Sequence, residues 1–154
     1  MPTPPQPPHP HDPSCIFCKI AAGTIPCHKI FEDDLILAFL DIAPIVPGHA
    51  LVIPKAHYPN LLDTPPDILA AINARLPRLA QALLNAAGAP ACHVLTNCGP
   101  EASQSVPHLH YHILPRFAND SYRLPWPAKA LDPASAAALK TAVISALAQP
   151  NVNP

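Results

Sequence analysis

The sequence carries no excess of charge of either sign and no long apolar run. Nine Lys and Arg stand against ten Asp and Glu among 154 residues, and these charges form no basic stripe. A surface that holds nucleic acid through many phosphate contacts is therefore not expected. No apolar run approaches the ~18 residues of a membrane span, and the N-terminus lacks the basic-then-apolar order of a secretion signal. We expect a cytoplasmic protein that binds neither nucleic acid nor a membrane.

The cysteine count does not suit a disulfide framework, whereas proline is abundant. Five cysteines, at positions 15, 18, 27, 92 and 98, are an odd number. In a reducing compartment they are expected to be thiols or metal ligands. Of 24 prolines, seven stand in the first 13 residues, MPTPPQPPHPHDP, which have almost no apolar side chains. Residues 1–13 are therefore predicted to form a disordered tail with polyproline-II bias.

Short apolar runs separated by turn-forming residues follow this tail. HKIFEDD (28–34), ILAFLDI (36–42) and ALVIPK (50–55) are rich in Ile, Leu, Phe and Val, which predicts an antiparallel meander. CHVLTN (92–97) and HLHYHILPR (108–116) predict a fourth and a fifth strand.

Two segments have helical periodicity instead. Apolar residues recur every three or four positions through residues 66–88, where Pro77 is expected to kink or divide the helix and Gly88 to end it. Residues 132–148 begin with an N-capping aspartate and a proline at the first helical position.

These patterns together predict an α+β fold. It consists of a five-stranded, mostly antiparallel sheet with one long helix and one C-terminal helix against it. We place the domain at residues 14–117 and a C-terminal extension at residues 118–154. The extension, with its helix, is expected to pack on the domain or on a dimer partner.

The stretch HLHYHILPR contains three of the nine histidines of the chain. His108, His110 and His112 alternate with apolar residues, so in an extended strand their imidazoles project from one face. Three histidines in register need a common partner. The pattern alone fits a metal site, a phosphate-handling site or a chance arrangement.

A polar loop precedes these histidines. Asn97, Gly99, Gln104 and Ser105 offer side chains and backbone N–H groups that could bind anionic oxygens. Neutral histidine is a competent nucleophile near pH 7, and protonated histidine is a good donor to phosphate. A central histidine flanked by imidazole or hydroxyl donors could take a nucleotidyl group from an amine or phosphate leaving group, and water would then release it.

Three segments resemble the histidine triad (HIT) family, specifically its bacterial nucleotide hydrolases. They are CIFCKIAAGTIP, FLDIAPIVPGHALVIPKAH and NCGPEASQSVPHLHYHILPR, and the resemblance runs from about Cys15 to Arg116. It implies a HIT-like fold, a purine nucleotide substrate and a homodimer. It also implies hydrolysis at the α-phosphate through a covalent nucleotidyl-histidine.

The resemblance assigns four residues to the chemistry. His110 matches the nucleophile, and His112 matches the histidine that contacts the phosphate. Ser105 matches the residue near the leaving group. His49 matches a fourth histidine, which orients the nucleophile.

It also assigns residues to substrate binding. Asn97 and Gln104 match contacts on the α-phosphate side, and Asp41 with Ile42 matches the ribose-binding pair. The apolar base pocket is matched by Ile16, Phe17, Ile20 and Phe39.

One residue of the loop departs from the family. The family has Ala-Gly-Gln where this chain has Ala102, Ser103 and Gln104. If the glycine permits a backbone conformation or a close approach to phosphate, Ser103 is expected to introduce strain or crowding there.

The spacing Cys15-x-x-Cys18 is half of a metal site or a redox pair. The resemblance supplies two further ligands, because His57 and His108 match the zinc ligands of some bacterial HIT proteins. Two thiolates and two imidazoles would make a closed Cys₂His₂ tetrahedron, which is structural rather than catalytic.

Two classes of function follow. The first is a hydrolase of nucleoside phosphoramidates, aminoacyl adenylates or diadenosine polyphosphates. The loop GPEASQ resembles the dinucleoside-polyphosphate branch, whereas CIFCKI and the short chain favour the phosphoramidase-like branch. The second is an interaction module that binds a nucleotide without turnover and recruits a partner through its proline-rich tail.

Overall fold

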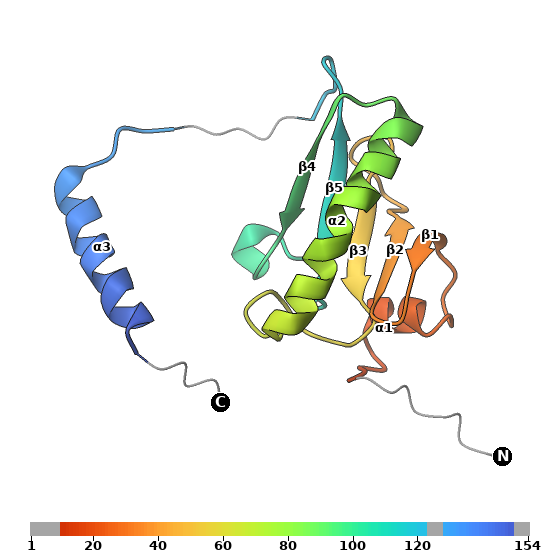
Figure 1. Ribbon diagram of the computed structural model, residues 1–154, viewed down its shortest axis with the longest axis horizontal. Helices are drawn as coiled ribbons and strands as arrows, with labels where there is room; N and C mark the ends of the chain where they lie inside the picture. Colours follow the sequence, from red (N-terminus) through yellow and green to blue (C-terminus); the bar gives the residue numbers. More distant parts are fainter. Residues whose placement is uncertain (1–9, 123–127, 150–154) are drawn as a thin grey trace. The chain divides into compact units, whose positions relative to one another are not determined.

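The computed structural model describes residues 10–122 and 128–149. In these residues five strands form one sheet in the order β1-β2-β3-β5-β4, and every neighbouring pair is antiparallel (Figure 1). The elements are α1 (Ile16–Ala21), β1 (His28–Glu32), β2 (Ile36–Leu40), β3 (Ala50–Pro54), α2 (Pro66–Ala87), β4 (Ala91–Thr96), the short 3₁₀ helix η1 (Pro100–Ala102), β5 (Tyr111–Arg116) and α3 (Pro133–Leu147). The predicted α+β fold and its five-stranded sheet are confirmed.

The histidine-bearing strand β5 lies inside the sheet. Strands β1, β2 and β3 form the expected meander, and α2 then carries the chain over the sheet to its far edge, where β4 lies. β5 returns between β3 and β4, so that Tyr111 pairs with Val52 on one side and Thr96 on the other. A strand paired on both sides is a rigid support for a functional site.

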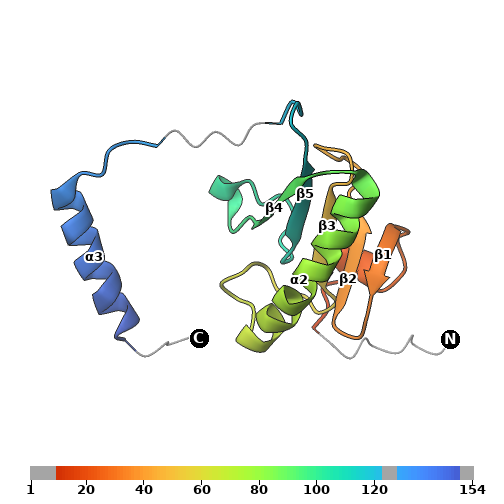
Figure 2. The same ribbon diagram turned by 45° about the horizontal axis from the view of Figure 1, so that its top comes forward.

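The two faces of the sheet are covered by different helices. Helix α2 lies along one face in both views (Figures 1 and 2). The core on that face includes Ile36, Val52, Tyr111 and Ile113 from the strands and Ile72, Leu76, Leu79 and Leu83 from α2. The core on the other face joins α1 to β2 and β3 and consists of Cys15, Phe17, Cys18, Leu37, Phe39, Leu51 and Ile53.

Helix α2 is a single helix of 22 residues, so the expected division at Pro77 does not occur. Pro77 and Asn73, whose carbonyl loses its helical partner, are both exposed. Water can satisfy that carbonyl, while the buried residues on the opposite side hold the helix to the sheet. Gly88 ends the helix as predicted, in the left-handed conformation with φ of 66°.

Strand β5 begins at Tyr111, three residues later than the sequence indicates. The preceding backbone is bonded to other groups, because the N–H of Leu109 donates to the carbonyl of Tyr58 and the hydroxyl of Thr96 donates to the carbonyl of His110. Helix α1 was not predicted, since six residues are too few to show a helical period.

Pro10 and Asp12, which the sequence places in a disordered tail, make hydrogen bonds to the domain. Residues 1–9 lie outside the described part of the chain, but the carbonyl of Pro10 accepts from the N–H of His57 and the N–H of Asp12 points at the sulfur of Cys18. The backbone from residue 10 is therefore bonded to the domain.

The chain divides into two compact units, residues 1–122 and 123–154. The division falls after residue 122 rather than 117, because Arg116 donates to the carboxylate of Asp120 and to the carbonyl of Tyr122. Helix α3 has the predicted Asp132 cap but buries none of its residues. No helix in the described ranges is long and apolar enough to span a membrane.

Candidate active site

His108, His110 and His112 lie on the face of the sheet that α1 covers. Their neighbours Leu109, Tyr111 and Ile113 belong to the core under α2, so the alternation predicted from the sequence is confirmed. The ring of Phe17 in α1 lies edge-on to the rings of His108 and His110, with centroids 5.9 and 5.1 Å away. The three imidazoles do not share one partner, however, and each has its own environment.

The ring of His110 is held in one orientation and one tautomer. Its Nδ1 lies 2.6 Å from the carbonyl oxygen of His108 and must donate to it, because a carbonyl can only accept. Burial lowers the pKa of His110, which keeps the ring neutral near pH 7. The single proton is therefore on Nδ1, and Nε2 carries a lone pair.

His112 has the opposite tautomer, and His49 determines it. The backbone N–H of Ile45 donates to Nδ1 of His49 at 3.4 Å, so the proton of neutral His49 is on Nε2. That Nε2 lies 2.9 Å from Nδ1 of His112 and donates to it. His112 consequently carries its own proton on Nε2, which is buried without a hydrogen-bond partner among the described residues. An unpartnered buried donor is costly unless a ligand accepts from it.

Burial keeps this pair of histidines uncharged. It lowers the pKa of His49, and it lowers the pKa of His112 to about 4, with a further contribution from the neighbouring imidazoles. The family resemblance implies that His49 orients the nucleophile, but its ring contacts His112 and not His110. Besides its direct electrostatic interaction with His110, His49 can act on that ring through His112, whose ring centroid is 5.0 Å from that of His110.

Asp41 completes a group with these two histidines. Its carboxylate lies 3.6 Å from Nε2 of His49 and also accepts from the N–H of Ala43. Asp41, His49 and His112 are close enough to hold a metal ion. The facing nitrogens of the two histidines are already joined by a hydrogen bond, so we assign this group to hydrogen bonding.

An apolar cavity of about 250 Å³ lies beside His110 and His112. Nine of the predicted site residues line it, namely Ile16, Phe17, Ile20, Phe39, Asp41, Ile42, Ser105, His110 and His112. Phe17 and Phe39 pack edge-to-face with centroids 5.8 Å apart. The sequence did not reveal five further lining residues, Ile25, Pro26, Cys27, Leu51 and Val106. Three of these follow α1 in an irregular loop, where no periodicity or motif indicates a role.

Asn97 and Gln104 are not among the residues that line the cavity. Gln104 accepts from the N–H of Gly99 at 2.9 Å and donates to the carbonyls of Pro59 and Val106. The amide of Asn97 donates to the carbonyl of Ser103 at 3.3 Å. Both side chains thus brace the loop that carries Ser105.

Ser103 has the strained conformation expected where the family has glycine. Its φ of 65° and ψ of 29° are left-handed, and no other non-glycine residue in the described ranges has a positive φ. A side chain costs roughly 1–2 kcal/mol in this conformation. The loop therefore accommodates Ser103 at a cost in stability.

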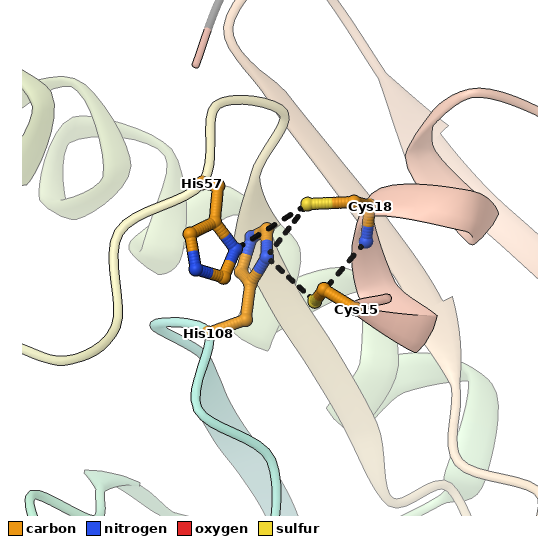
Figure 3. A group of neighbouring side chains, drawn as sticks. All are labelled: Cys15, Cys18, His57 and His108. Atoms are coloured by element: carbon orange, nitrogen blue, oxygen red, sulfur yellow. Dashed lines mark hydrogen bonds between the residues drawn. The ribbon is translucent and has the colours of Figure 1, made fainter. Parts of the chain in front are cut away.

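The predicted metal ligands come together beside the site (Figure 3). Cys15, which caps the N-terminus of α1, and Cys18 within α1 point toward His57, which follows β3, and toward His108. The donor atoms of all four lie within 4.8 Å of one another. Cys18 and His108 are fully buried and Cys15 is nearly so. We refer to these four residues as the Cys/His centre.

The distances in the Cys/His centre fit a tetrahedral ion. Sγ of Cys15 lies 3.4 Å from Nδ1 of His108, and Sγ of Cys18 lies 3.4 Å from Nδ1 of His57 and 3.6 Å from Nδ1 of His108. Zinc bonded at about 2.3 Å to sulfur and about 2.05 Å to nitrogen sets tetrahedral S and N ligands about 3.5 Å apart. Nε2 of His108 donates to the carbonyl of Pro54 at 2.9 Å, so its Nδ1 lone pair faces the sulfurs.

The surroundings of the sulfurs also suit a bound cation. Burial raises the pKa of Cys18 to about 11, so without a positive charge nearby this thiol stays protonated. The backbone N–H groups of Asp12 and Cys18 point at the sulfurs of Cys18 and Cys15, each at 3.5 Å. Such donors stabilise thiolates once a metal has displaced their protons.

Comparison with known proteins places this geometry in context. The HIT domain model matches residues 22–119. The adenosine 5′-monophosphoramidase of Schizosaccharomyces pombe is 45% identical over 128 residues, which cover 82% of this chain and 92% of that protein. The adenylylsulfatase of Arabidopsis thaliana is 44% identical over 106 residues, which cover 69% of this chain. This chain spans only 54% of the Arabidopsis protein.

Solved structures agree with the fold. A protein from Streptococcus mutans superimposes with a TM-score of 0.87 at 36% identity, covering 94% of this chain and 92% of that chain. A HIT family member from Bacillus subtilis gives a TM-score of 0.83 at 36% identity, covering 89% of this chain and 99% of the other.

Proposed function

The chain belongs to the histidine triad (HIT) family, and we propose that it hydrolyses purine nucleotides at the α-phosphate through a covalent nucleotidyl-His110 intermediate. The observation that carries this proposal is a pair of ring atoms with complementary chemistry beside one cavity. His110 has a lone pair on Nε2, which suits a nucleophile, and His112 has an unpartnered N–H on Nε2, which suits a phosphoryl oxygen.

The lining of the cavity supports a nucleotide as the ligand. Its apolar end, formed by Ile16, Phe17, Ile20 and Phe39, suits the two faces of a purine. Asp41 and Ile42 stand where a ribose would follow, and the Asp41 carboxylate can accept from ribose hydroxyls. The α-phosphate then lies between His110, His112 and Ser105.

Two displacements at phosphorus complete the reaction. In the first, Nε2 of His110 bonds to the α-phosphorus, and the bond from phosphorus to the leaving group breaks. Ser105 donates to the leaving group, while His112 donates to the phosphoryl oxygen on which charge accumulates. In the second, water bonds to phosphorus and the bond to His110 breaks. Ser105 has then passed its proton to the leaving group in the first step and regained one from water in the second, while the hydroxyl of that water has gone to the nucleoside monophosphate.

We favour nucleoside phosphoramidates as substrates. The S. pombe relative, which is aligned over most of both chains, is named for this activity. The Arabidopsis relative is named for cleavage of an adenylyl sulfate. Diadenosine polyphosphates are the alternative that the loop GPEASQ favours.

The Cys/His centre is proposed to bind zinc. Its four donors would close the coordination sphere of the ion, leaving no position for substrate. A zinc ion there would cross-link α1 to the segments that carry His57 and His108. The reaction steps use only His110, His112, Ser105 and water.

A homodimer is proposed to form along β4. This strand is an edge of the sheet, and Val94 on it is 44% exposed. The opposite edge, β1, is irregular in its pairing and carries Lys29 and Glu32, which are features that block pairing with another strand. Light scattering should show a dimer for the wild type, and Val94→Lys should yield monomer.

The experiment that tests the hydrolase is turnover of adenosine 5′-phosphoramidate by the wild type and by His110→Ala. The wild type should release AMP, and brief mixing followed by acid-free mass spectrometry should detect adenylylated protein. His110→Ala should release none while still binding AMP by calorimetry. If the wild type binds AMP but turns over neither this compound, adenylyl sulfate nor diadenosine polyphosphates, the protein is a nucleotide-binding module.

A further inference from the structure

His108 joins the Cys/His centre to the nucleophile. Its side chain faces the sulfurs of Cys15 and Cys18 through Nδ1. Its main-chain carbonyl accepts the Nδ1 proton of His110 at 2.6 Å. The bond that places the nucleophilic lone pair on Nε2 of His110 therefore depends on how the carbonyl of a metal-ligand residue is oriented.

That carbonyl belongs to the peptide group between His108 and Leu109, and the other end of this group is also held. The N–H of Leu109 donates to the carbonyl of Tyr58 at 2.6 Å. Tyr58 directly follows His57, the ligand that faces Cys18 at 3.4 Å. The carbonyl of this peptide group thus belongs to one residue of the Cys/His centre, His108, and its N–H is anchored to the residue next to another, His57.

No sheet pairing holds this peptide group, because β5 begins only at Tyr111. The burial of His108 and its bond to the carbonyl of Pro54 fix the ring but leave the carbonyl direction to the local backbone. Four ligands on one ion would restrain His57 and His108 relative to each other. They would thereby also restrain the His108–Leu109 peptide plane, whose N–H is bonded to Tyr58.

We infer that the Cys/His centre is a positioning device for His110, which acts by fixing the His108–Leu109 peptide plane. This inference rests on the proposed hydrolase. It predicts that loss of the ion lowers kcat while AMP binding changes little, because His57 does not line the cavity and α1, which does, is also packed on β2 and β3 through Phe17. A merely structural metal site would lower only stability.

The decisive variants are His57→Ala, His57→Cys and the control Cys92→Ser. His57→Ala removes one ligand, whereas His57→Cys keeps a closed set of three thiolates and one imidazole. Cys92 is a half-buried thiol on β4 outside the centre. For each protein we measure metal content, kcat, the Kd of AMP, and the imidazole ¹⁵N and Nδ1–H resonances of His110. The wild type is measured before chelation, after chelation and after zinc is added back.

We expect His57→Ala and the chelated wild type to lose the protected Nδ1–H resonance of His110 and at least tenfold in kcat, with the Kd of AMP within about threefold. His57→Cys with zinc and Cys92→Ser should retain both. An unchanged His110 resonance in metal-free protein overturns the inference, as does a loss of kcat that zinc-loaded His57→Cys does not restore. The resonance and AMP binding remain informative if the wild type has no turnover, so failure of the proposed reaction is distinguished from failure of the positioning.

Discussion

Nε2 of His49 lies 2.9 Å from Nδ1 of His112, and this contact decides which nitrogen of His112 presents a proton to the cavity. The two residues are 63 positions apart in the chain. The same contact separates the roles of two neighbouring histidines. A carbonyl group fixes the tautomer of His110, whereas an imidazole ring fixes the opposite tautomer of His112.

Replacing His49 should therefore impair the chemistry more than nucleotide binding. In His49→Ala, the Nδ1 of His112 loses its donor and the ring is free to change tautomer. Loss of a buried hydrogen bond of about 1–3 kcal/mol corresponds to a kcat lowered roughly 5- to 150-fold. Steady-state kinetics and AMP calorimetry measure the two effects.

His49→Gln is the matched control for this experiment, because its amide can donate to the same nitrogen. It should recover part of the lost rate. Equal rates for His49→Ala and the wild type would contradict the tautomer relationship.

Acid should destabilise the fold by way of the buried histidines. The pKa of His112 is about 4 in the folded protein against 6.5 ordinarily, mainly because of burial. Between these values the unfolded chain binds a proton that the folded protein does not, so the free energy of unfolding falls as pH decreases from 6.5 to about 4. Urea denaturation at about pH 7 and about pH 5 measures this loss, and His112→Asn should lose less than the wild type. Equal losses would show that His112 is not the titrating group.

Ser103→Gly should stabilise the protein. Glycine adopts a φ of 65° without the penalty that Ser103 incurs. Part of the gain is offset by the greater freedom of glycine in the unfolded chain, which leaves about 0.5–1 kcal/mol and an increase of about 2–4 °C in Tm. Calorimetry measures the change. Ser103→Ala keeps the Cβ atom and should give no gain, and a comparable gain there would rule out backbone strain as the cause.

Much of the fold was accessible from the sequence because its periodicities are strong. The alternation in HLHYHILPR correctly placed three imidazoles on one face, and the apolar spacing in residues 66–88 correctly gave a long helix. Of the kink or division expected at Pro77, the division does not occur, because a proline on the exposed side of a well-anchored helix costs one hydrogen bond that water can replace. Helix α1 was missed because it is too short to show a period.

The site was only partly accessible, for a different reason. The family resemblance indicated most of the cavity residues and completed the Cys/His centre that the spacing of Cys15 and Cys18 suggested, but it did not give the connections between them. Whether the ring of His49 meets His110 or His112, and whether Gln104 faces the cavity or the loop, depends on side-chain directions that spacing does not determine. Residues 25–27, which line one side of the cavity, show no sequence pattern. Their position follows only from the path of the backbone after α1.

Helix α1 constrains how the substrate preference of this protein can be redesigned. Together with its N-cap Cys15, it supplies three residues that line the apolar cavity, Ile16, Phe17 and Ile20, and both sulfurs of the Cys/His centre. A library that varies these lining residues would also disturb the ligands interleaved with them. Residues 25–27 line the same pocket and contribute no ligand to the centre, so mutagenesis for altered base selectivity should begin there.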